Sequence, residues 1–251
     1  MSETKLGFNL LKRLSQKELL IPYLENSLIA DNWPEKYTVE VDSSPYTGTG
    51  DGWFHPSSHA LKDERWLYYN LHPDHKDNVI QERNTLQRAL TLSMGSALHA
   101  VVQTQFLMAK LITKDDIEVP SKSEQHHARG SMDFRINHPN GHKYGIEFKT
   151  QNSRSFDLEQ VPKATWVAQL NCYLDWNNLE EGIILVMESG FPYRMKEFHI
   201  VLDPKLLGEV YDRWDRVLEA IADNNPPQFC CALGSQTMDS CSHRNSCWLA
   251  K

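Results

Sequence analysis

The sequence has little of what marks a membrane, exported or repetitive protein. No stretch approaches the roughly 18 consecutive apolar residues that a membrane-spanning helix requires. The first residues lead into an amphipathic stretch with Lys12, Arg13 and Lys17, and they lack the continuous apolar core and small-residue cleavage site of a secretion signal. No internal repeat is visible in the sequence. We therefore expect a cytoplasmic protein with no membrane association.

An excess of positive charge is also missing. The chain has 26 Lys and Arg against 33 Asp and Glu, and its formal net charge is −7. This balance argues against a protein whose whole surface is basic and binds nucleic acid. It allows a local basic groove, because recognition depends on how charge is distributed. With 40% hydrophobic and 24% charged residues among 251, the composition is that of one globular domain, or of a domain with an appendage.

Hydrophobic periodicity predicts helices interleaved with strands. Helical patterns cover residues 8–24, 85–112, 162–176 and 204–222, with a further helix start near 55–58, and strand patterns cover 128–136, 143–150, 182–187 and 196–201. This order predicts an α/β or α+β fold, in which helices flank a central mixed sheet. We expect a single domain over residues 1–251, divided into an N-terminal helical segment (1–84), a core (85–203) and a C-terminal helix with a cysteine-rich tail (204–251).

Two neighbouring strands carry the most informative pair of residues, Asp133 and Glu147. If the hairpin folds symmetrically about Asn140, these two carboxylates face each other across the strands. The opposite face would then pair these apolar residues: Phe134 with Ile146, and Met132 with Phe148. Facing carboxylates roughly 5 Å apart are destabilising unless a cation lies between them. The pattern indicates either a divalent-metal site or a solvated polar face of the sheet.

Residues from three other positions could complete a site. Lys149 projects from the same face as Glu147, two residues further on. His99 lies among small residues on the long helical pattern, and it is either a metal ligand or a structural histidine. Gln169 and Tyr173 lie four residues apart on a predicted helix and so share one face, where the alternative is a surface glutamine and a packed tyrosine.

The order of these motifs resembles that of the RecB-like nucleases of the PD-(D/E)xK superfamily. The matching motifs are Gly95-x-x-x-His99, Gly130-x-x-Asp133, Glu147-x-Lys149 and Gln169-x-x-x-Tyr173, which together cover roughly residues 95–173. Each motif is weak alone, but four in this order are a strong signal. The resemblance implies a restriction-endonuclease-like core. A second likeness, to the iron–sulfur branch that includes CRISPR-associated adaptation nucleases and phage exonucleases, lies in Pro56-Ser-Ser58, Asp63-Glu-Arg65 and Tyr68-Tyr69.

The resemblance implies a role for each matching residue. The set that would bind Mg²⁺ or Mn²⁺ consists of His99, Asp133, Glu147 and the carbonyl of Phe148, and such oxygen-rich sites suit both ions. Lys149 would position or activate the attacking water and neutralise charge on the phosphate. Gln169 and Tyr173 would line the groove and contact DNA or the site.

Cysteine is scarce along most of the chain and then clusters in the tail. Of the five cysteines, Cys172 is expected to be a packed thiol, and the other four are Cys230, Cys231, Cys241 and Cys247. In a chain expected to be cytoplasmic, such clustering favours a metal site over disulfides. The related nucleases hold a [4Fe–4S] cluster with one cysteine from the N-terminal segment and three from the C-terminus, but this chain has Asp63 at the first position.

Several interpretations of the tail stay open. A [4Fe–4S] cluster could use all four cysteines, or Asp63 could serve as an unusual oxygen ligand. Alternatively, Zn²⁺ could take Cys230 or Cys231 together with Cys241, His243 and Cys247. The thiols could also be free. The resemblance favours the iron–sulfur cluster, whereas spacing alone would not choose it over zinc.

Basic and aromatic side chains near the motifs are candidates for DNA contacts. Phosphates could be tracked by Arg129, Arg135, Arg154 and Lys163, and Trp166 could stack on the bases of a single strand. Core packing is the alternative role for the aromatic residue. No motif that reads base sequence is visible in the chain.

The sequence therefore predicts a metal-dependent deoxyribonuclease, an exonuclease acting on DNA ends or single-stranded DNA. Phage recombination or repair and CRISPR adaptation are the settings that the resemblance implies, in a bacterial or phage-infected host cell, with a recombination or annealing protein as a conceivable partner. Two alternatives stay open: a non-catalytic DNA-binding module of the same fold, and a restriction-type endonuclease.

Overall fold

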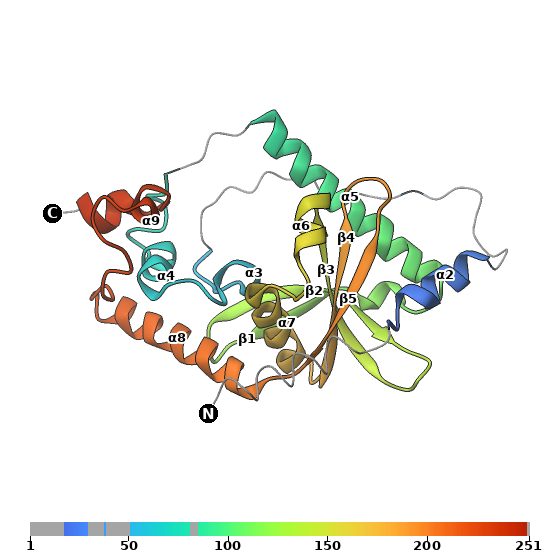
Figure 1. The fold of residues 1–251 in the computed structure, drawn as a ribbon. Coiled ribbons are helices and arrows are strands. Elements are labelled where there is room, and N and C mark those ends of the chain that lie inside the picture. Colours follow the sequence, from blue (N-terminus) through green and yellow to red (C-terminus); the bar gives the residue numbers. More distant parts are fainter. Residues whose placement is uncertain (1–17, 30–37, 39–50, 81–84, 250–251) are drawn as a thin grey trace, which may run out of the picture. The chain divides into compact units, whose positions relative to one another are not determined.

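The computed structural model describes residues 18–29, 38, 51–80 and 85–249, and Figure 1 shows their elements. These residues form two compact units. The first unit takes its described residues from Met1–Ser43, Leu86–Ser121 and Ser131–Leu202. The second takes them from Ser44–Thr85, Lys122–Gly130 and Asp203–Lys251. None of the helices in these described ranges is long and apolar enough to cross a membrane.

The first unit is built on a five-stranded mixed sheet. Its strands lie in the order β1 (Ile117–Ser123), β2 (Ala128–Asn137), β3 (Lys143–Gln151), β4 (Glu181–Glu188) and β5 (Met195–Val201). The pairs β2–β3 and β4–β5 are antiparallel, whereas β3 and β4 are parallel. The predicted mixed sheet is therefore confirmed. The sequence did not predict β1, which contains Pro120, a residue that sheets tolerate at an edge such as this one.

Helices cover both faces of this sheet. One face packs against α2 (Ile21–Ile29) and α5 (Leu86–Met108), where Val102 and Phe106 meet the apolar residues of β2 and β3. The other face packs against α7 (Ala164–Trp176), which contributes Leu170 and Leu174. Because α7 connects the parallel strands β3 and β4, it crosses over the sheet, as a parallel connection requires. The helices predicted at 85–112 and 162–176 are confirmed.

The β2–β3 hairpin has the predicted register but not the predicted faces. Phe134 pairs with Ile146, as expected. Met132 was expected to share their face and does not: it packs with Leu170 on the α7 side, whereas Phe134 packs on the α5 side. Side chains two residues apart on a regular strand share a face, so the alternation is interrupted at the intervening residue, Asp133. Irregularities of this kind re-aim a side chain, and they occur next to active sites.

The second unit is mainly helical. It contains α3 (Pro56–His59), α4 (Glu64–Leu71), α8 (Pro204–Ala222), α9 (Gln236–Asp239) and a π-helical turn η2 (Asn245–Leu249). Its core includes Trp214 of α8, which is fully buried and stacks on Phe54 with ring centroids 5.0 Å apart. Helix α8 has the predicted bounds because Asp203 caps its first turn and Pro204 suits that turn.

The remaining elements of the first unit are short. A 3₁₀ turn, η1 (Lys114–Asp116), precedes β1, and α6 (Ser153–Leu158) follows β3. Of the helical pattern predicted at 8–24, residues 8–17 lie outside the described residues, and α2 begins at Ile21. Glu197 of β5, whose side chain is 1% exposed, fixes that start by accepting hydrogen bonds from the backbone N–H groups of Leu20 and Ile21 at 2.7 and 2.6 Å.

Candidate active site

Two buried carboxylates meet where the hairpin is irregular. The side chains of Asp133 and Glu147 lie on β2 and β3, and these residues are 9% and 2% exposed. Asp133 Oδ2 accepts a hydrogen bond from the backbone N–H of Phe148 at 2.7 Å. Burial raises the pKa of Asp133 to about 7. Burial, together with repulsion from Asp133, raises the pKa of Glu147 to about 8. Asp133 is thus close enough to Glu147 for its charge to act on the ionisation of Glu147.

The histidine of the long helix joins this pair. His99, on α5, places Nδ1 3.7 Å from Asp133 Oδ1. Its ring meets that of Phe148 edge to face, with centroids 4.7 Å apart. Burial lowers the pKa of His99, although the charge of Glu147 opposes this effect. A lowered pKa keeps the imidazole neutral at physiological pH, and the neutral form is the one that binds metals.

Lys149 and Gln169 organise the other side of Glu147. Glu147 Oε1 accepts hydrogen bonds from Lys149 Nζ at 2.6 Å and from Gln169 Nε2 at 2.8 Å, and Gln169 Oε1 accepts one from Lys149 Nζ at 3.1 Å. The amide of Gln169 therefore bridges the ammonium and the carboxylate. Burial acts to lower the pKa of Lys149, but the charges of Glu147 and Asp133 outweigh it and raise that pKa, so the amine stays protonated.

Tyr173 lies one helical turn beyond Gln169 on α7, as the spacing predicted. The residue is 2% exposed. Burial, and then the nearby charge of Glu147, raises the pKa of its hydroxyl, which stays neutral. The structure therefore brings together all the residues to which the motifs assigned catalytic or metal-binding roles.

The donor atoms at this site suit a hard cation. Glu147 Oε2 is buried and has no hydrogen-bond partner, so one oxygen of the pair is left for another positive group. Carboxylate oxygens, a backbone carbonyl and a neutral imidazole are ligands that Mn²⁺ and Mg²⁺ accept. As the side chains stand, no three His, Cys, Asp or Glu residues in the described ranges are close enough to enclose an ion. The side chains would therefore have to move to form a ligand sphere around an ion.

A further acid, Glu118 of β1, lies beside the site and was not predicted. Its Oε2 accepts a hydrogen bond from Ser131 Oγ at 3.0 Å, and its Oε1 accepts one from Gln103 Nε2 at 3.2 Å. Its charge acts on the pKa of both His99 and Asp133. No motif spacing signals this residue, and the strand that carries it was itself missed.

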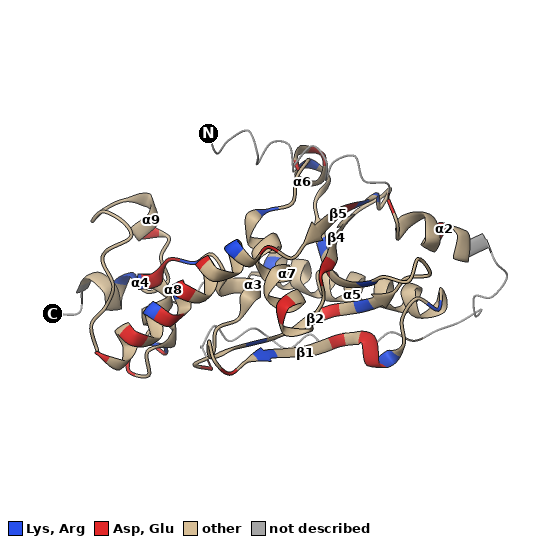
Figure 2. Ribbon diagram, turned by 90° about the horizontal axis from the view of Figure 1, so that it is seen from below, with Lys and Arg blue, Asp and Glu red and all other residues tan. Residues whose placement is uncertain are grey.

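Two of the arginines predicted to contact DNA already form ion pairs. Arg135, in the first unit, pairs with Asp116 at 3.0 Å. Arg129, in the second unit, pairs with Asp51 at 2.5 Å. Basic and acidic residues are interspersed along β1 and β2 (Figure 2). Both arginines therefore already have a carboxylate partner and would have to exchange it for phosphate.

The segment that leads into α7 presents basic and aromatic groups to solvent. Lys163 is exposed, lies 3.5 Å from a carboxylate oxygen of Glu159, and places Nζ 4.6 Å from the ring centroid of Trp166. Arg154, on α6, is also exposed. Lys163 is the N-cap residue of α7, and Trp166 lies on the same helix as Gln169, a residue of the site.

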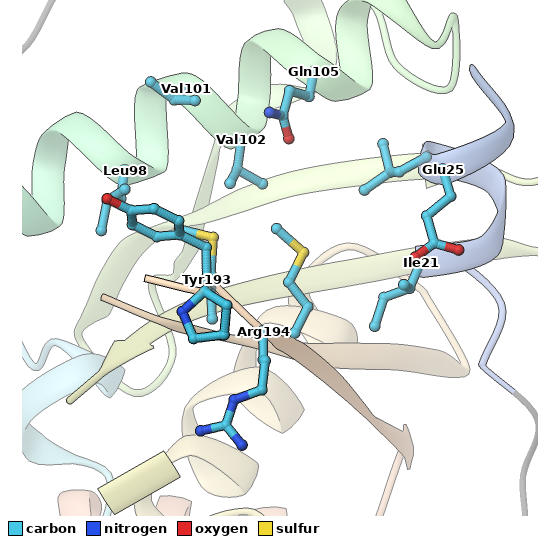
Figure 3. A pocket seen from close by; sticks show the side chains of 12 residues that line it. Ile21, Glu25, Leu98, Val101, Val102, Gln105, Tyr193 and Arg194 are labelled. Atoms are coloured by element: carbon cyan, nitrogen blue, oxygen red, sulfur yellow. The ribbon is translucent and has the colours of Figure 1, made fainter. Parts of the chain in front are cut away.

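A separate cleft lies on the α5 side of the first unit. It has a volume of about 570 Å³ and an apolar lining that includes Ile21, Leu98, Val102 and Tyr193 (Figure 3). The lining residues come from α2, α5, the end of β4 and the segment leading into β5. Neither Asp133 nor Glu147 is among them. This apolar cleft is therefore distinct from the candidate catalytic residues.

In the second unit the tail cysteines interact with one another. Hydrogen bonds and charge couple Cys230 to Cys231 and to Asp63, and charge couples Cys241 to Cys231 and Cys247. Burial and the hydrogen bond with Asp63 raise the pKa of Cys230 to about 12.

Two buried side chains lie next to this tail. The Nε–H of Arg65 donates to Cys247 Sγ at 2.9 Å. His243 is buried, with Nδ1 unpartnered and Nε2 3.3 Å from Asn70 Oδ1. The thiol of Cys172 lies elsewhere, buried in α7, which confirms that it is a packed residue.

Comparisons with known proteins show the fold and no family. No family model and no curated protein sequence matches the chain. Among solved structures, an alkaline exonuclease (LHK-Exo) from Laribacter hongkongensis is similar, with 14% identity, 69% of this chain and 89% of that chain covered, and a TM-score of 0.49. Its complex with dAMP gives 16% identity, the same coverage and a TM-score of 0.50. The protein SSO0001 gives 17% identity, 88% and 90% coverage and a TM-score of 0.43. The chain thus has an α/β fold similar to that of this exonuclease.

Proposed function

We propose that the chain is a metal-dependent deoxyribonuclease that hydrolyses phosphodiester bonds at DNA ends. The observation that carries the proposal is the convergence of two buried acids with a neutral histidine and a protonated lysine. The fold likeness to an exonuclease supports it, as does the complex of that enzyme with dAMP, a nucleotide of the kind that DNA hydrolysis releases.

The residues divide into those that would hold an ion and those that would act beside it. Asp133, Glu147, His99 and the carbonyl of Phe148 would hold Mg²⁺ or Mn²⁺. The bound ion would supply Lewis-acid polarisation of a phosphoryl oxygen and lower the pKa of a water. The Lys149 ammonium would neutralise charge on the phosphate, because it is a compact cation on the same strand as Glu147.

Gln169 would hold the side chains of Lys149 and Glu147 in a fixed relative position. Its amide contacts both groups at once, so neither side chain can rotate away without breaking a hydrogen bond. Tyr173, on the same face of α7, would present a neutral hydroxyl rather than a competing anion to the substrate. Gln169 thus orients the lysine and the acid, and Tyr173 adds no further negative charge near the phosphate. Positioning and electrostatic stabilisation are the contributions that phosphoryl transfer requires of a protein.

Cleavage of end-labelled linear DNA and of closed circular DNA tests the proposal. Purified protein is incubated with each substrate in Mn²⁺, Mg²⁺ or EDTA. Progressive loss of linear DNA alone, with none in EDTA, is expected. Discrete cuts in the circle would replace the exonuclease with an endonuclease. DNA binding without cleavage under any condition would replace it with a binding module.

Variants of the site test whether the cleavage comes from this protein or from a contaminating nuclease. Glu147→Gln and Lys149→Met should abolish cleavage. Lys143→Met is the matched control, because Lys143 is exposed at the start of the same strand. Retained activity in either site variant would overturn the assignment.

We also propose that the cysteine tail binds a metal, with a [4Fe–4S] cluster favoured over Zn²⁺. The support is the clustering of four cysteines in the tail, where Cys230 lies near Cys231, together with Arg65, a buried cation whose Nε–H donates to Cys247 Sγ. Such a centre would stabilise the second unit. Anaerobic purification, metal analysis and a visible spectrum test it. Iron with absorption near about 400 nm supports the cluster, zinc replaces it, and metal-free protein rejects both.

A further inference from the structure

Glu118 ties three elements together beside Asp133. Its carboxylate accepts from Ser131 of β2 and from Gln103 of α5, while the residue itself belongs to β1. The same Gln103 amide also lies 3.4 Å from the backbone oxygen of Asp133. One exposed carboxylate therefore connects the edge strand, the long helix and the backbone of a candidate metal ligand.

The backbone at Glu118 is held in an unusual conformation. Its φ is +48°, in the left-handed region that a residue with a long side chain rarely adopts. Such a conformation persists only where surrounding contacts impose it, and it is concentrated at functional sites. The contacts to Ser131 and Gln103 are the ones that hold the carboxylate of Glu118 in place.

The contacts of Glu118 coincide with the irregularity in β2. Ser131 and Asp133 flank Met132, whose side chain lies on the α7 side, while Phe134 lies on the α5 side. Asp133 lies at this irregularity, and its Oδ1 is 3.7 Å from Nδ1 of His99. A clamp that fixes the strand on both sides of Met132 would also fix the direction of the Asp133 carboxylate.

We propose that Glu118, acting through Gln103 and Ser131, is a positioning residue that holds Asp133 in its metal-binding orientation. This inference rests on the proposed nuclease function. Glu118 touches neither the ion nor the substrate in this role. It holds the backbone from which the Asp133 side chain projects. Mutating a residue that positions a metal ligand typically lowers metal affinity or activity by about 10- to 100-fold.

The test compares Glu118→Ala and Gln103→Met with the control Glu124→Ala. Glu124 is another exposed acid, which lies between β1 and β2 and pairs with Lys122 of β1. Mn²⁺ affinity is measured by electron paramagnetic resonance of the free ion, and cleavage is measured as kcat and KM. Each clamp variant should lose about 10-fold in Mn²⁺ affinity and in kcat, with KM for DNA changed less than about two-fold. Because the two residues act as one unit, the double variant should lose little more than either single variant.

Folding is checked by circular dichroism, and Glu118→Gln provides a milder variant. Glu118→Gln keeps one acceptor oxygen, so its loss should fall between those of wild type and Glu118→Ala. Clamp variants that equal Glu124→Ala in Mn²⁺ affinity and kcat would overturn the inference, as would a wild-type protein that binds no Mn²⁺. If wild type binds Mn²⁺ but cleaves no DNA, the proposed function fails and the Mn²⁺ affinities alone decide the role of Glu118.

Discussion

Adding a divalent cation should stabilise the protein, and the gain should increase with pH. Without an ion, burial raises the pKa of Asp133 from 3.8 to about 7 and that of Glu147 from 4.5 to about 8. A carboxyl group whose pKa is raised by folding favours the folded state when it is protonated. The stability it contributes is therefore complete below its unfolded pKa, and it is lost as the pH rises through about 7 to 8.

The size of this effect follows from the shifts. A shift of about three pKa units in one buried group corresponds to about 4 kcal/mol, and the two coupled acids share rather than double that cost. A cation that binds the ionised pair competes with protons, so its affinity rises over the same pH range. At about 100 times its dissociation constant, the ion adds about 2.7 kcal/mol to the free energy of unfolding. For a chain of this size the gain corresponds to roughly 5–10 °C in Tm.

Thermal unfolding with Mn²⁺ or EDTA, followed from about pH 5.5 to about pH 8.5, measures the gain. We expect almost no difference at the acid end and the full difference at the alkaline end. The double variant Asp133→Asn, Glu147→Gln is the control and should show neither the pH dependence nor the gain. A Tm gain that is equal at both pH limits, or that survives in the double variant, would place the ion elsewhere and refute the reasoning.

Three other substitutions test single contacts. Lys149→Met should lower cleavage by at least about 100-fold, because it removes a cation from the reacting phosphate, while its Tm stays close to that of Lys143→Met. An equal loss of cleavage in Lys143→Met would assign the effect to overall charge. Gly182→Ala should cost about 1–3 kcal/mol in urea unfolding, since a Cβ there would lie 2.7 Å from a backbone oxygen of β3. Gly190→Ala, with nothing within 4 Å, is its control, and equal stability of the two would contradict the packing argument. Glu197→Ala should lose about 1–3 kcal/mol, because backbone N–H groups at the start of α2 lose their acceptor; unchanged unfolding would show that water replaces it.

The elements that the sequence predicts well are those whose pattern is local. Helix α8 combines a capping aspartate, a proline at its first position and apolar residues at helical spacing, and its bounds match the prediction. The hairpin register follows from the turn and from alternation, so Phe134 and Ile146 pair as expected. Local pattern could not bring His99 near Asp133 and Glu147, because the three residues lie on separate elements; only the order of the motifs suggested that they share a site.

The features that the sequence missed depend on tertiary contacts. Strand β1 contains Pro120 and few apolar residues, and it forms at the sheet edge only because β2 offers a partner there. Strict alternation misplaced Met132, since an irregular strand leaves no mark on the pattern of residues. Glu118 could not be singled out among 33 acidic residues without the bonds that hold it.

The environment of Glu147 supports the proposed cation site. Its Oε1 already accepts hydrogen bonds from Lys149 and Gln169, whereas its Oε2 is buried without a partner. An unpaired buried carboxylate oxygen is costly, and a water, a proton or a positive ion on that side would remove the cost. A proton or a water would satisfy Glu147 alone and leave Asp133 to be neutralised separately. The proposed divalent cation would neutralise both acids together, and the neutral imidazole of His99, 3.7 Å from Asp133, would be a further ligand.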